Sequence, residues 1–85
     1  MSYKITYKKS VFKDLSKLEK SEAKKILSKI ETDLKKNANQ NPILKGMFQG
    51  LRKLRVGNYR VIYSILNDVV LILRIAHRKE VYKNQ

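Results

Sequence analysis

A Gly-Asn dipeptide between two alternating segments constrains the fold of this chain more than any other feature. Residues 51–56 read LRKLRV and residues 59–65 read YRVIYSI, so apolar and polar side chains nearly alternate on both sides of Gly57 and Asn58. Gly-Asn tolerates the positive φ values that two-residue hairpin turns require. The sequence therefore predicts an antiparallel hairpin whose register is set by this turn.

This hairpin would have an apolar face and a basic face, because side chains alternate along a strand. The apolar face is expected to hold Leu54, Val56, Tyr59, Val61, Tyr63 and Ile65. The basic face is expected to hold Lys53, Arg55, Arg60, Ile62 and Ser64. Directly opposed like charges such as Arg55 and Arg60 destabilise a sheet by roughly a few tenths of a kcal/mol. A bound polyanion would offset this repulsion, and two side chains spread into water beside an acid are the alternative.

The positive charge of the chain exceeds what solubility requires and predicts binding to a polyanion. The formal net charge is +13 in 85 residues. The first 36 residues hold eleven lysines and no arginine, whereas all five arginines lie after residue 50. Arginine presents a planar fork that contacts two phosphate oxygens at once, whereas lysine is a hydrated point charge. We therefore expect the first half to attract anions and the second half to position them.

Composition excludes several classes of protein. The chain has no cysteine and one histidine, so a disulfide framework, a thiolate metal site and a zinc site are not expected. No apolar run approaches the roughly 20 residues of a membrane span, and the start of the chain lacks the apolar core of a signal peptide. We expect one cytoplasmic domain over residues 1–85, with no metal, cofactor, small-molecule ligand or membrane partner.

The first half of the chain predicts one strand and two amphipathic helices. Residues 3–7 alternate as a short strand that we expect to join the sheet, and Ser10 and Ser21 are the expected helix N-caps. The apolar stripes of the helices are expected to hold Val11, Phe12, Leu15, Leu18, Ala23, Ile26, Leu27, Ile30 and Leu34. The charged residues between them, Asp14 included, indicate a solvated face. Residues 37–42, NANQNP, are interpreted as a loop.

A nearly continuous apolar run over residues 69–76, VVLILRIA, predicts the most buried strand of the sheet. Asn67 and Asp68 mark the turn before it, and Arg74 is the exception within the run. A two-residue turn would place Arg74 on the apolar face, where burying a charge is costly, whereas a three-residue turn places it opposite Arg60. We favour the three-residue turn for this reason.

Three strings in this order resemble the RelE/ParE superfamily of toxins from toxin–antitoxin systems. They are LKGM at residues 44–47, LRKLRVGNYRVIY at residues 51–63 and LRIAHRKEVY at residues 73–82. The closer likeness is to the RelE branch, the mRNA interferases that cleave messenger RNA in the ribosomal A site, rather than to the ParE branch, which poisons DNA gyrase. The resemblance implies an α+β fold in the order β-α-α-β-β-β, with an N-terminal strand and a two-helix hairpin on one face of a small, mainly antiparallel sheet.

The resemblance also implies a functional site, in which basic and aromatic groups surround the scissile phosphate. The residues that match those positions are Lys45, Lys53, Arg55, Arg60, Arg78 and Tyr82. The catalytic candidates are Lys53, Arg60, Arg78 and Tyr82. The RNA-binding candidates are Lys45, Arg55, Arg74 and His77, the last two by their place in the final strand and directly after it. Leu51 departs from the pattern, because the best-known bacterial member has a lysine there and the adjacent Arg52 is expected to face the other side.

The chemistry of these residues suits RNA cleavage by the 2′-hydroxyl, which needs a base, a proton donor for the leaving oxygen and stabilisation of negative charge. A lysine crowded by arginines has its charged form disfavoured, so Lys53 could act as the base while Arg60 and Arg78 hold the phosphate. His77 or Arg78 could protonate or neutralise the leaving oxygen. The set lacks a familiar acid–base pair, so we expect the ribosome to orient the substrate.

Two other functions stay open on the sequence alone: a non-nuclease, ParE-like toxin that inhibits DNA gyrase, and a non-toxic basic domain that binds nucleic acid. His77 could equally be a capping or surface residue and Tyr82 a core residue. In a toxin, the resemblance implies a RelB-like antitoxin whose acidic, amphipathic segment covers the basic face. Messenger RNA and the ribosome, with contacts to 16S rRNA, are the other expected partners.

Overall fold

The computed structural model of the chain describes residues 2–43 and 50–77, and its elements follow the predicted order. They are β1 (Lys4–Tyr7), α1 (Lys9–Ser16), α2 (Lys20–Lys29), the π-helical turn η1 (Ile30–Leu34), α3 (Lys35–Asn37), the 3-10 turn η2 (Ala38–Gln40), β2 (Arg52–Val56), β3 (Tyr59–Leu66) and β4 (Val69–His77). Three candidate site residues, Lys45, Arg78 and Tyr82, lie outside the described residues.

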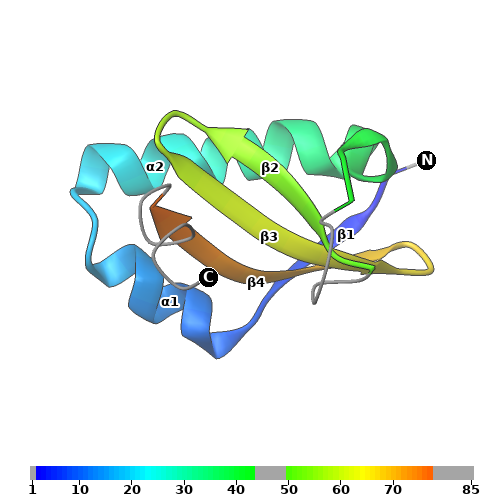
Figure 1. Ribbon diagram of the computed structural model, residues 1–85, viewed down its shortest axis with the longest axis horizontal. Helices are drawn as coiled ribbons and strands as arrows, with labels where there is room; N and C mark the ends of the chain where they lie inside the picture. The colour runs from blue at the N-terminus through cyan, green and yellow to red at the C-terminus, as the bar shows by residue number, and fades with distance from the viewer. Residues whose placement is uncertain (1, 44–49, 78–85) are drawn as a thin grey trace.

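The four strands form one mixed sheet in the order β1-β4-β3-β2. The β2–β3 and β3–β4 pairs are antiparallel, whereas β1 pairs with β4 in parallel. Figure 1 shows the strands in front of α1 and α2, so the sheet has a helix-covered face and an outer face. The predicted α+β fold is confirmed, including the N-terminal strand that joins the sheet. None of the described helices has the length and apolar character needed to cross a membrane.

The turn between β2 and β3 lies at the predicted Gly57 and Asn58. Gly57 has a φ of 58°, in the left-handed region that glycine adopts without steric cost, whereas the φ of Asn58 is not positive. A positive φ at the first turn position only is the pattern of a type II′ hairpin turn. The predicted register is confirmed, because Arg55 pairs with Arg60 on the next strand.

The core lies between the helices and the predicted apolar face of the hairpin. The hairpin contributes four buried side chains, with two more partly buried: Leu54, Val56, Val61 and Tyr63, then Tyr59 and Ile65. The other buried members are Val11, Ile26, Ile30, Leu34, Ala38, Val70, Ile72 and Ile75. The predicted apolar face is therefore confirmed. The stripe of the second helix is confirmed at Ile26, Ile30 and Leu34, whereas Ala23 and Leu27 are only half-buried and lie outside the core cluster. Burial of this apolar surface is the main stabilising contribution to the fold.

Residues 37–42 do not form the expected loop. Ala38–Gln40 continue the helical segment as a 3-10 turn, and the side chain of Ala38 is buried in the core. The Tyr63 hydroxyl donates a hydrogen bond to the Ala38 carbonyl at 2.7 Å and accepts one from Nδ2 of Asn41 at 3.0 Å. Terminal helix carbonyls need such partners, so the buried tyrosine stabilises helical structure where local propensity predicts none.

Both predicted N-caps are wrong. Lys8 precedes α1 and Glu19 precedes α2, so Ser10 and Ser21 each lie in the first turn of a helix. Neither helix has a side-chain hydrogen bond at its N-cap. The helices therefore begin without the local capping that the serines suggested, and packing on the sheet is left to stabilise them.

Phe12 is not part of the core, contrary to the prediction. It is 60% exposed, and its ring centroid lies 6.4 Å from that of Tyr7. Val11 is the buried residue of α1, and each step along a helix turns the side chain by about 100°. Because Val11 points into the core, the Phe12 side chain points away from it, toward Tyr7 at the edge of the sheet.

A bulge in β4, which the sequence did not predict, sets the position of Arg74. The β3–β4 turn has two residues, with a φ of 57° at Asn67. The register shifts by one residue after the middle of the strands, so that Arg74 pairs with Ile62. The predicted three-residue turn and the pairing with Arg60 are therefore wrong. The predicted face is nevertheless correct, because one extra residue moves the following side chains to the other side.

Helix α1 continues the edge of the sheet beyond the end of β1. β1 pairs with β4 only over Val69–Ile72. Next along this edge, the Ser10 hydroxyl donates a hydrogen bond to the Leu73 carbonyl at 2.9 Å, and Oδ2 of Asp14 accepts one from the Ile75 amide at 2.9 Å. The prediction that Asp14 belongs to a solvated face is therefore wrong. Asp14 instead satisfies a backbone amide at an otherwise open strand edge.

Candidate functional site

Four cations gather on the outer face of β2, β3 and β4, in two neighbouring rows. One row holds Lys53, Ile62 and Arg74, and the next holds Arg55, Arg60 and Ala76. Directly opposed side chains in such rows have Cβ atoms about 4.5–5.5 Å apart. We refer to Lys53, Arg55, Arg60 and Arg74 as the cation cluster. The sequence predicted all four on this face.

Arg60 has the deepest position in the cation cluster. It is 8% exposed, whereas its cross-strand partner Arg55 is exposed and Lys53 is half-buried. A charge that is withdrawn from water is screened less and acts more strongly on a nearby charge. A ligand on this face would therefore meet one buried, strongly acting charge beside one exposed charge. This is a suitable arrangement for holding an anion.

No carboxylate in the described part of the chain forms an ion pair with Arg55. In residues 2–43 and 50–77, no Asp or Glu lies within ion-pair distance of Arg55 or Lys53. Like charges that pair across strands reduce stability. Arg55 and Lys53 thus have positive charges without a described carboxylate partner, which is the physical reason to regard the cation cluster as a candidate anion-binding site.

Arg74 is the exception in the cation cluster, because it has a carboxylate partner. Its Nε lies 3.3 Å from Oδ2 of Asp14, and the two side chains are 52% and 11% exposed. Asp14 thus offsets part of the charge of Arg74 and holds the guanidinium toward α1. The sequence analysis missed this contact, because the two residues are 60 positions apart and nothing near Asp14 in the chain indicates the pairing.

His77 does not join the cation cluster in the described structure. It pairs with Tyr59 across the β3–β4 ladder, and therefore shares the helix-covered side of the sheet. The two rings meet edge to face, with centroids 5.1 Å apart at 85°. The structure thus separates His77 from Lys53 and Arg60, with which the sequence analysis had grouped it.

Arg52 does not substitute for the lysine that the family pattern has at the position of Leu51. It pairs with Tyr63, and its Nη1 donates a hydrogen bond to the Asn41 carbonyl at 2.6 Å. Strand alternation predicted that Arg52 faces away from Lys53, and the pairing confirms it. Arg52 therefore supports the end of the helical segment rather than the cation cluster.

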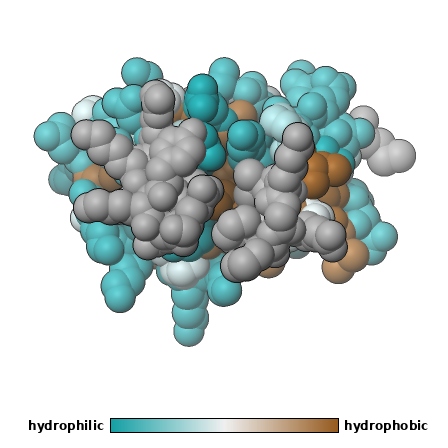
Figure 2. Space-filling model, in the orientation of Figure 1, coloured by the Kyte–Doolittle hydropathy of each residue, from teal (hydrophilic) through white to brown (hydrophobic). Residues whose placement is uncertain are grey.

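The described residues offer charge stabilisation rather than a metal or an acid–base pair. No group of three or more His, Cys, Asp or Glu residues in the described part of the chain is placed to hold a metal ion. Figure 2, which looks onto the outer face, shows hydrophilic side chains over most of the coloured surface. Several cations that converge on one face can bind an anion and stabilise developing negative charge.

The comparisons with known proteins identify the family of this chain. A family model described as the ParE toxin of the type II toxin–antitoxin system parDE matches residues 5–82. That match covers nearly the whole chain. The chain belongs to this toxin family. The chain is accordingly a type II toxin of the RelE/ParE superfamily and has its fold, as the three sequence strings predicted.

Relatives of this toxin carry both branch names. Toxin RelE1 of Methanocaldococcus jannaschii is 34% identical over an alignment of 94 positions that covers 99% of each chain. The toxin–antitoxin complex RelBE2 from Mycobacterium tuberculosis contains a chain with a TM-score of 0.85 and 26% identity, covering 92% of this chain and 100% of that one. The chromosomal ParDE system from P. aeruginosa gives a TM-score of 0.75 at 16% identity, covering 89% and 96%, which shows a shared fold alone.

Proposed function

We propose that this toxin is a ribosome-dependent endoribonuclease that cleaves messenger RNA in the ribosomal A site and so inhibits translation. The observation that carries the proposal is the cation cluster: Lys53 and Arg60 lie in adjacent rows of one rigid sheet face, with Arg55 beside them. A scissile phosphate above these rows would contact charges from two strands at once. The 34% identity to a protein named RelE supports the nuclease branch.

The proposed reaction is a transfer of the phosphoryl group within the RNA. The 2′-hydroxyl gives its proton to Lys53, its oxygen bonds to the adjacent phosphorus, and the bond from phosphorus to the 5′-oxygen breaks. The leaving 5′-oxygen takes up a proton from water, so the products are a 2′,3′-cyclic phosphate and a 5′-hydroxyl. Arg60 and Arg55 would stabilise the charge that builds on the phosphoryl oxygens, because guanidinium groups stay protonated.

Five further candidate residues have proposed roles, and three of them, Lys45, Arg78 and Tyr82, lie outside the described residues. Arg78 and Tyr82 are proposed to contact the phosphate and stack on a base, and Lys45 to bind the RNA backbone. His77 lies beside Tyr59 and is proposed to contact RNA beyond the scissile phosphate. Arg74 is proposed to bind RNA at the margin of the site, with its charge shared with Asp14.

Dependence on the ribosome follows from the composition of the site. A set dominated by cations binds any RNA phosphate but does little to align the 2′-oxygen, the phosphorus and the leaving oxygen. The ribosomal A site would supply that alignment by holding the messenger RNA, and the lysine-rich helices would contact 16S rRNA. Such a toxin would act in the cytoplasm.

A toxin of this kind needs a protein inhibitor in the cell that makes it. Solved complexes of similar fold pair such toxins with RelB proteins, as in Mycobacterium tuberculosis. We propose a RelB-like antitoxin as the cognate partner of this chain. With a net charge of +13, the toxin would favour an acidic partner.

Inhibition of DNA gyrase is the second candidate function. The observation that favours it is the matched family model, which is that of the ParE toxin. In this case the same fold would act by binding gyrase, and the cation cluster would contribute charge but no chemistry. The two functions differ in whether new RNA ends appear in cells.

Growth after induced expression, with primer extension on cellular messenger RNA, tests the proposal. Wild type is compared with Arg60→Ala and with Arg52→Ala, an arginine of the same hairpin that faces the other side. We expect arrest and new RNA ends inside coding regions for wild type and Arg52→Ala, and neither for Arg60→Ala. Circular dichroism of each variant separates loss of activity from loss of folding. Arrest without new ends would favour the gyrase function.

A further inference from the structure

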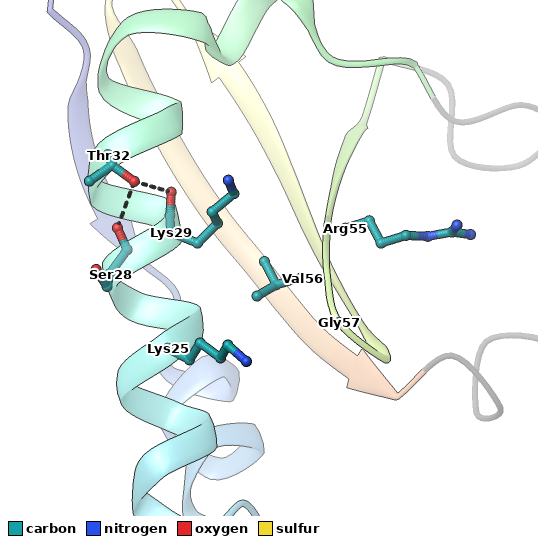
Figure 3. A pocket seen from close by; sticks show the side chains of 7 residues that line it. All are labelled: Lys25, Ser28, Lys29, Thr32, Arg55, Val56 and Gly57. Carbon is teal, nitrogen blue, oxygen red and sulfur yellow. Dashed lines mark hydrogen bonds between the residues drawn. The ribbon is translucent and has the colours of Figure 1, made fainter.

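Two arginines of the cation cluster have exposed side chains but differ in what they contact. Arg55 takes part in no ion pair of the described part of the chain, and Figure 3 shows its side chain extended away from α2. In the neighbouring row, Nε of Arg74 lies 3.3 Å from Oδ2 of Asp14 on α1. One exposed cation is therefore available to a ligand, and the other is already paired with a carboxylate.

Asp14 is held in place by the backbone of β4. Its side chain is 11% exposed, and the oxygen that contacts Arg74 also accepts a hydrogen bond from the Ile75 amide at 2.9 Å. One turn earlier on α1, the Ser10 hydroxyl donates a hydrogen bond to the Leu73 carbonyl at 2.9 Å. Residues four apart share one face of a helix. α1 is therefore attached to β4 on both sides of Arg74, at Leu73 and at Ile75.

A carboxylate that is fixed in this way binds an arginine more firmly than an exposed carboxylate does. Most surface ion pairs are weak, because two flexible side chains lose freedom and water screens their charges. Here only Arg74 has to be ordered, and the low exposure of Asp14 reduces the screening. A guanidinium has further N–H donors, but a phosphate that approaches them also approaches the Asp14 carboxylate, which repels it. The ion pair therefore disfavours phosphate binding at Arg74.

We propose that Asp14 is a positioning residue that withholds Arg74 from free RNA. The cation cluster then binds free RNA through Lys53, Arg55 and Arg60, with one phosphate contact fewer than four available cations would make. Arg74 contacts RNA only where the ribosome holds a phosphate against it, at the margin of the site. Weak binding to free RNA favours a toxin that acts in the A site, because other RNA competes for the same cations. Asp14 thereby contributes to the dependence on the ribosome.

The inference rests on the proposed function for its ligand, which is RNA, but it does not rest on cleavage. A purely structural role for Asp14 predicts a different result. If Asp14 only supports the edge of β4, its loss weakens RNA binding or leaves it unchanged. If Asp14 withholds Arg74, removal of its charge strengthens RNA binding, and does so only while Arg74 is present. The sign of the effect and its dependence on Arg74 therefore separate the two roles.

The test measures binding of a fluorescent RNA of about ten nucleotides by anisotropy, at several salt concentrations. The RNA carries 2′-O-methyl groups, so the proposed reaction cannot cleave it. Wild type is compared with Asp14→Asn, Arg74→Gln and the double variant. Asparagine removes the charge but keeps an oxygen that can accept the Ile75 amide. Glu22→Gln is the control, because it removes the same charge from an exposed carboxylate that joins no ion pair of the described chain.

We expect Asp14→Asn to bind this RNA about three- to tenfold more tightly than wild type, with a salt dependence steeper by about 0.7, the value for one more phosphate contact. The double variant should match Arg74→Gln within about twofold, and Glu22→Gln should match wild type within about twofold. Unchanged or weaker binding by Asp14→Asn would overturn the proposal. Tighter binding by the double variant than by Arg74→Gln would also overturn it, because the charge of Asp14 would then act without Arg74.

A second comparison does not require the Asp14 variant to fold. Arg74→Gln and Arg55→Gln each remove one exposed arginine of the cation cluster. Because Arg74 is withheld, Arg55→Gln should weaken binding about threefold more than Arg74→Gln does, and it alone should flatten the salt dependence by about 0.7. Circular dichroism confirms that each variant is folded. Equal losses in the two variants would overturn the proposal.

The nuclease and the role of Asp14 can fail separately. Cleavage of messenger RNA on ribosomes by wild type, without the expected binding pattern among the variants, would overturn the role of Asp14 alone. The expected binding pattern, without cleavage on ribosomes, would overturn the nuclease and leave Asp14 as a residue that limits RNA binding.

Discussion

The two faces of the sheet differ in how their polar groups are satisfied. On the helix-covered face, the fully buried Tyr63 has its hydroxyl bonded to Ala38 and Asn41, so the protein supplies every partner it needs. On the outer face, Arg55 and Arg60 oppose each other. The first face holds the molecule together, and the second brings two like charges opposite each other, an arrangement that by itself reduces stability. Changes on the two faces should therefore have opposite consequences for stability and activity.

The largest effect is expected in the core. Ile72→Ala removes a fully buried side chain and leaves a cavity, which should lower the free energy of unfolding by about 2–5 kcal/mol. Its neighbour Leu71 lies on the outer face and is half-buried, so Leu71→Ala should cost clearly less. Urea unfolding followed by circular dichroism measures both. Equal losses would show that the two faces contribute alike to stability.

Removal of the Asp14 carboxylate, which contacts both Arg74 and the Ile75 amide, should cause the second-largest loss of stability. Asp14→Ala leaves the Ile75 amide and Arg74 without their shared carboxylate, at a cost of about 1–3 kcal/mol. The control Asp33→Ala breaks a largely exposed ion pair with Lys29 and should cost about 0–1 kcal/mol. Hydrogen exchange at the Ile75 amide should accelerate only in the first variant. An unchanged exchange rate there would contradict the proposed edge contact.

Removal of one buried hydroxyl should have a smaller effect. Tyr63→Phe keeps the ring but leaves the Ala38 carbonyl and the Asn41 amide without their partner, at a cost of about 1–2 kcal/mol. Thermal unfolding measures the loss. Tyr3→Phe is the control, because no hydrogen bond joins the Tyr3 hydroxyl to another residue of the described chain. If the two variants unfold alike, the Tyr63 network does not stabilise the end of the helical segment.

The same tyrosine predicts a loss of stability in alkali. Burial raises the pKa of Tyr63 above 10.0, although the Asn41 hydrogen bond and the Arg52 charge act in the opposite direction. The folded state then keeps this proton to a higher pH than the unfolded state does. The stabilising contribution is complete below about pH 10 and is lost as the pH rises through the raised value. Between about pH 9 and 11, wild type should lose more stability than Tyr63→Phe; parallel curves would contradict this.

The smallest effect on stability is expected on the outer face. Arg55→Gln removes one of two opposed charges, so the free energy of unfolding should stay unchanged or rise by roughly a few tenths of a kcal/mol. Arg52→Gln, on the other face, breaks the bond to the Asn41 carbonyl and should cost about 1 kcal/mol. Chemical denaturation compares the two. A marked loss for Arg55→Gln would mean that the cation cluster is structural.

The fold was largely predictable because local and periodic signals agreed. Gly57 and Asn58 set the hairpin register, and the alternation around them placed the cation cluster on one face. The errors arose where a distant contact overrides local preference. Ala38 and Asn41 appear as a loop until Tyr63 is known to bond them, and Asp14 appears solvated until the backbone of β4 is beside it.

The candidate site was predictable in part for the same reason. Strand alternation is sufficient to assign Lys53, Arg55 and Arg60 to one face. The position of Arg74 depends on a bulge after the middle of β4, which no residue in that apolar run indicates. The place of His77 depends on the same one-residue shift, which turns it toward Tyr59. Lys45, Arg78 and Tyr82 stay predictions of the family resemblance.

The most direct test of the central claim is cleavage of a defined messenger RNA on purified ribosomes stalled with an open A site. Wild type is compared with Lys53→Gln, with gyrase supercoiling measured on the same preparations. The account predicts one cut in the A-site codon that yields a 2′,3′-cyclic phosphate and a 5′-hydroxyl. Lys53→Gln should cleave about 10²–10⁴-fold more slowly, and gyrase should be unaffected. Inhibition of supercoiling by wild type, without any cut in the RNA, would contradict the account.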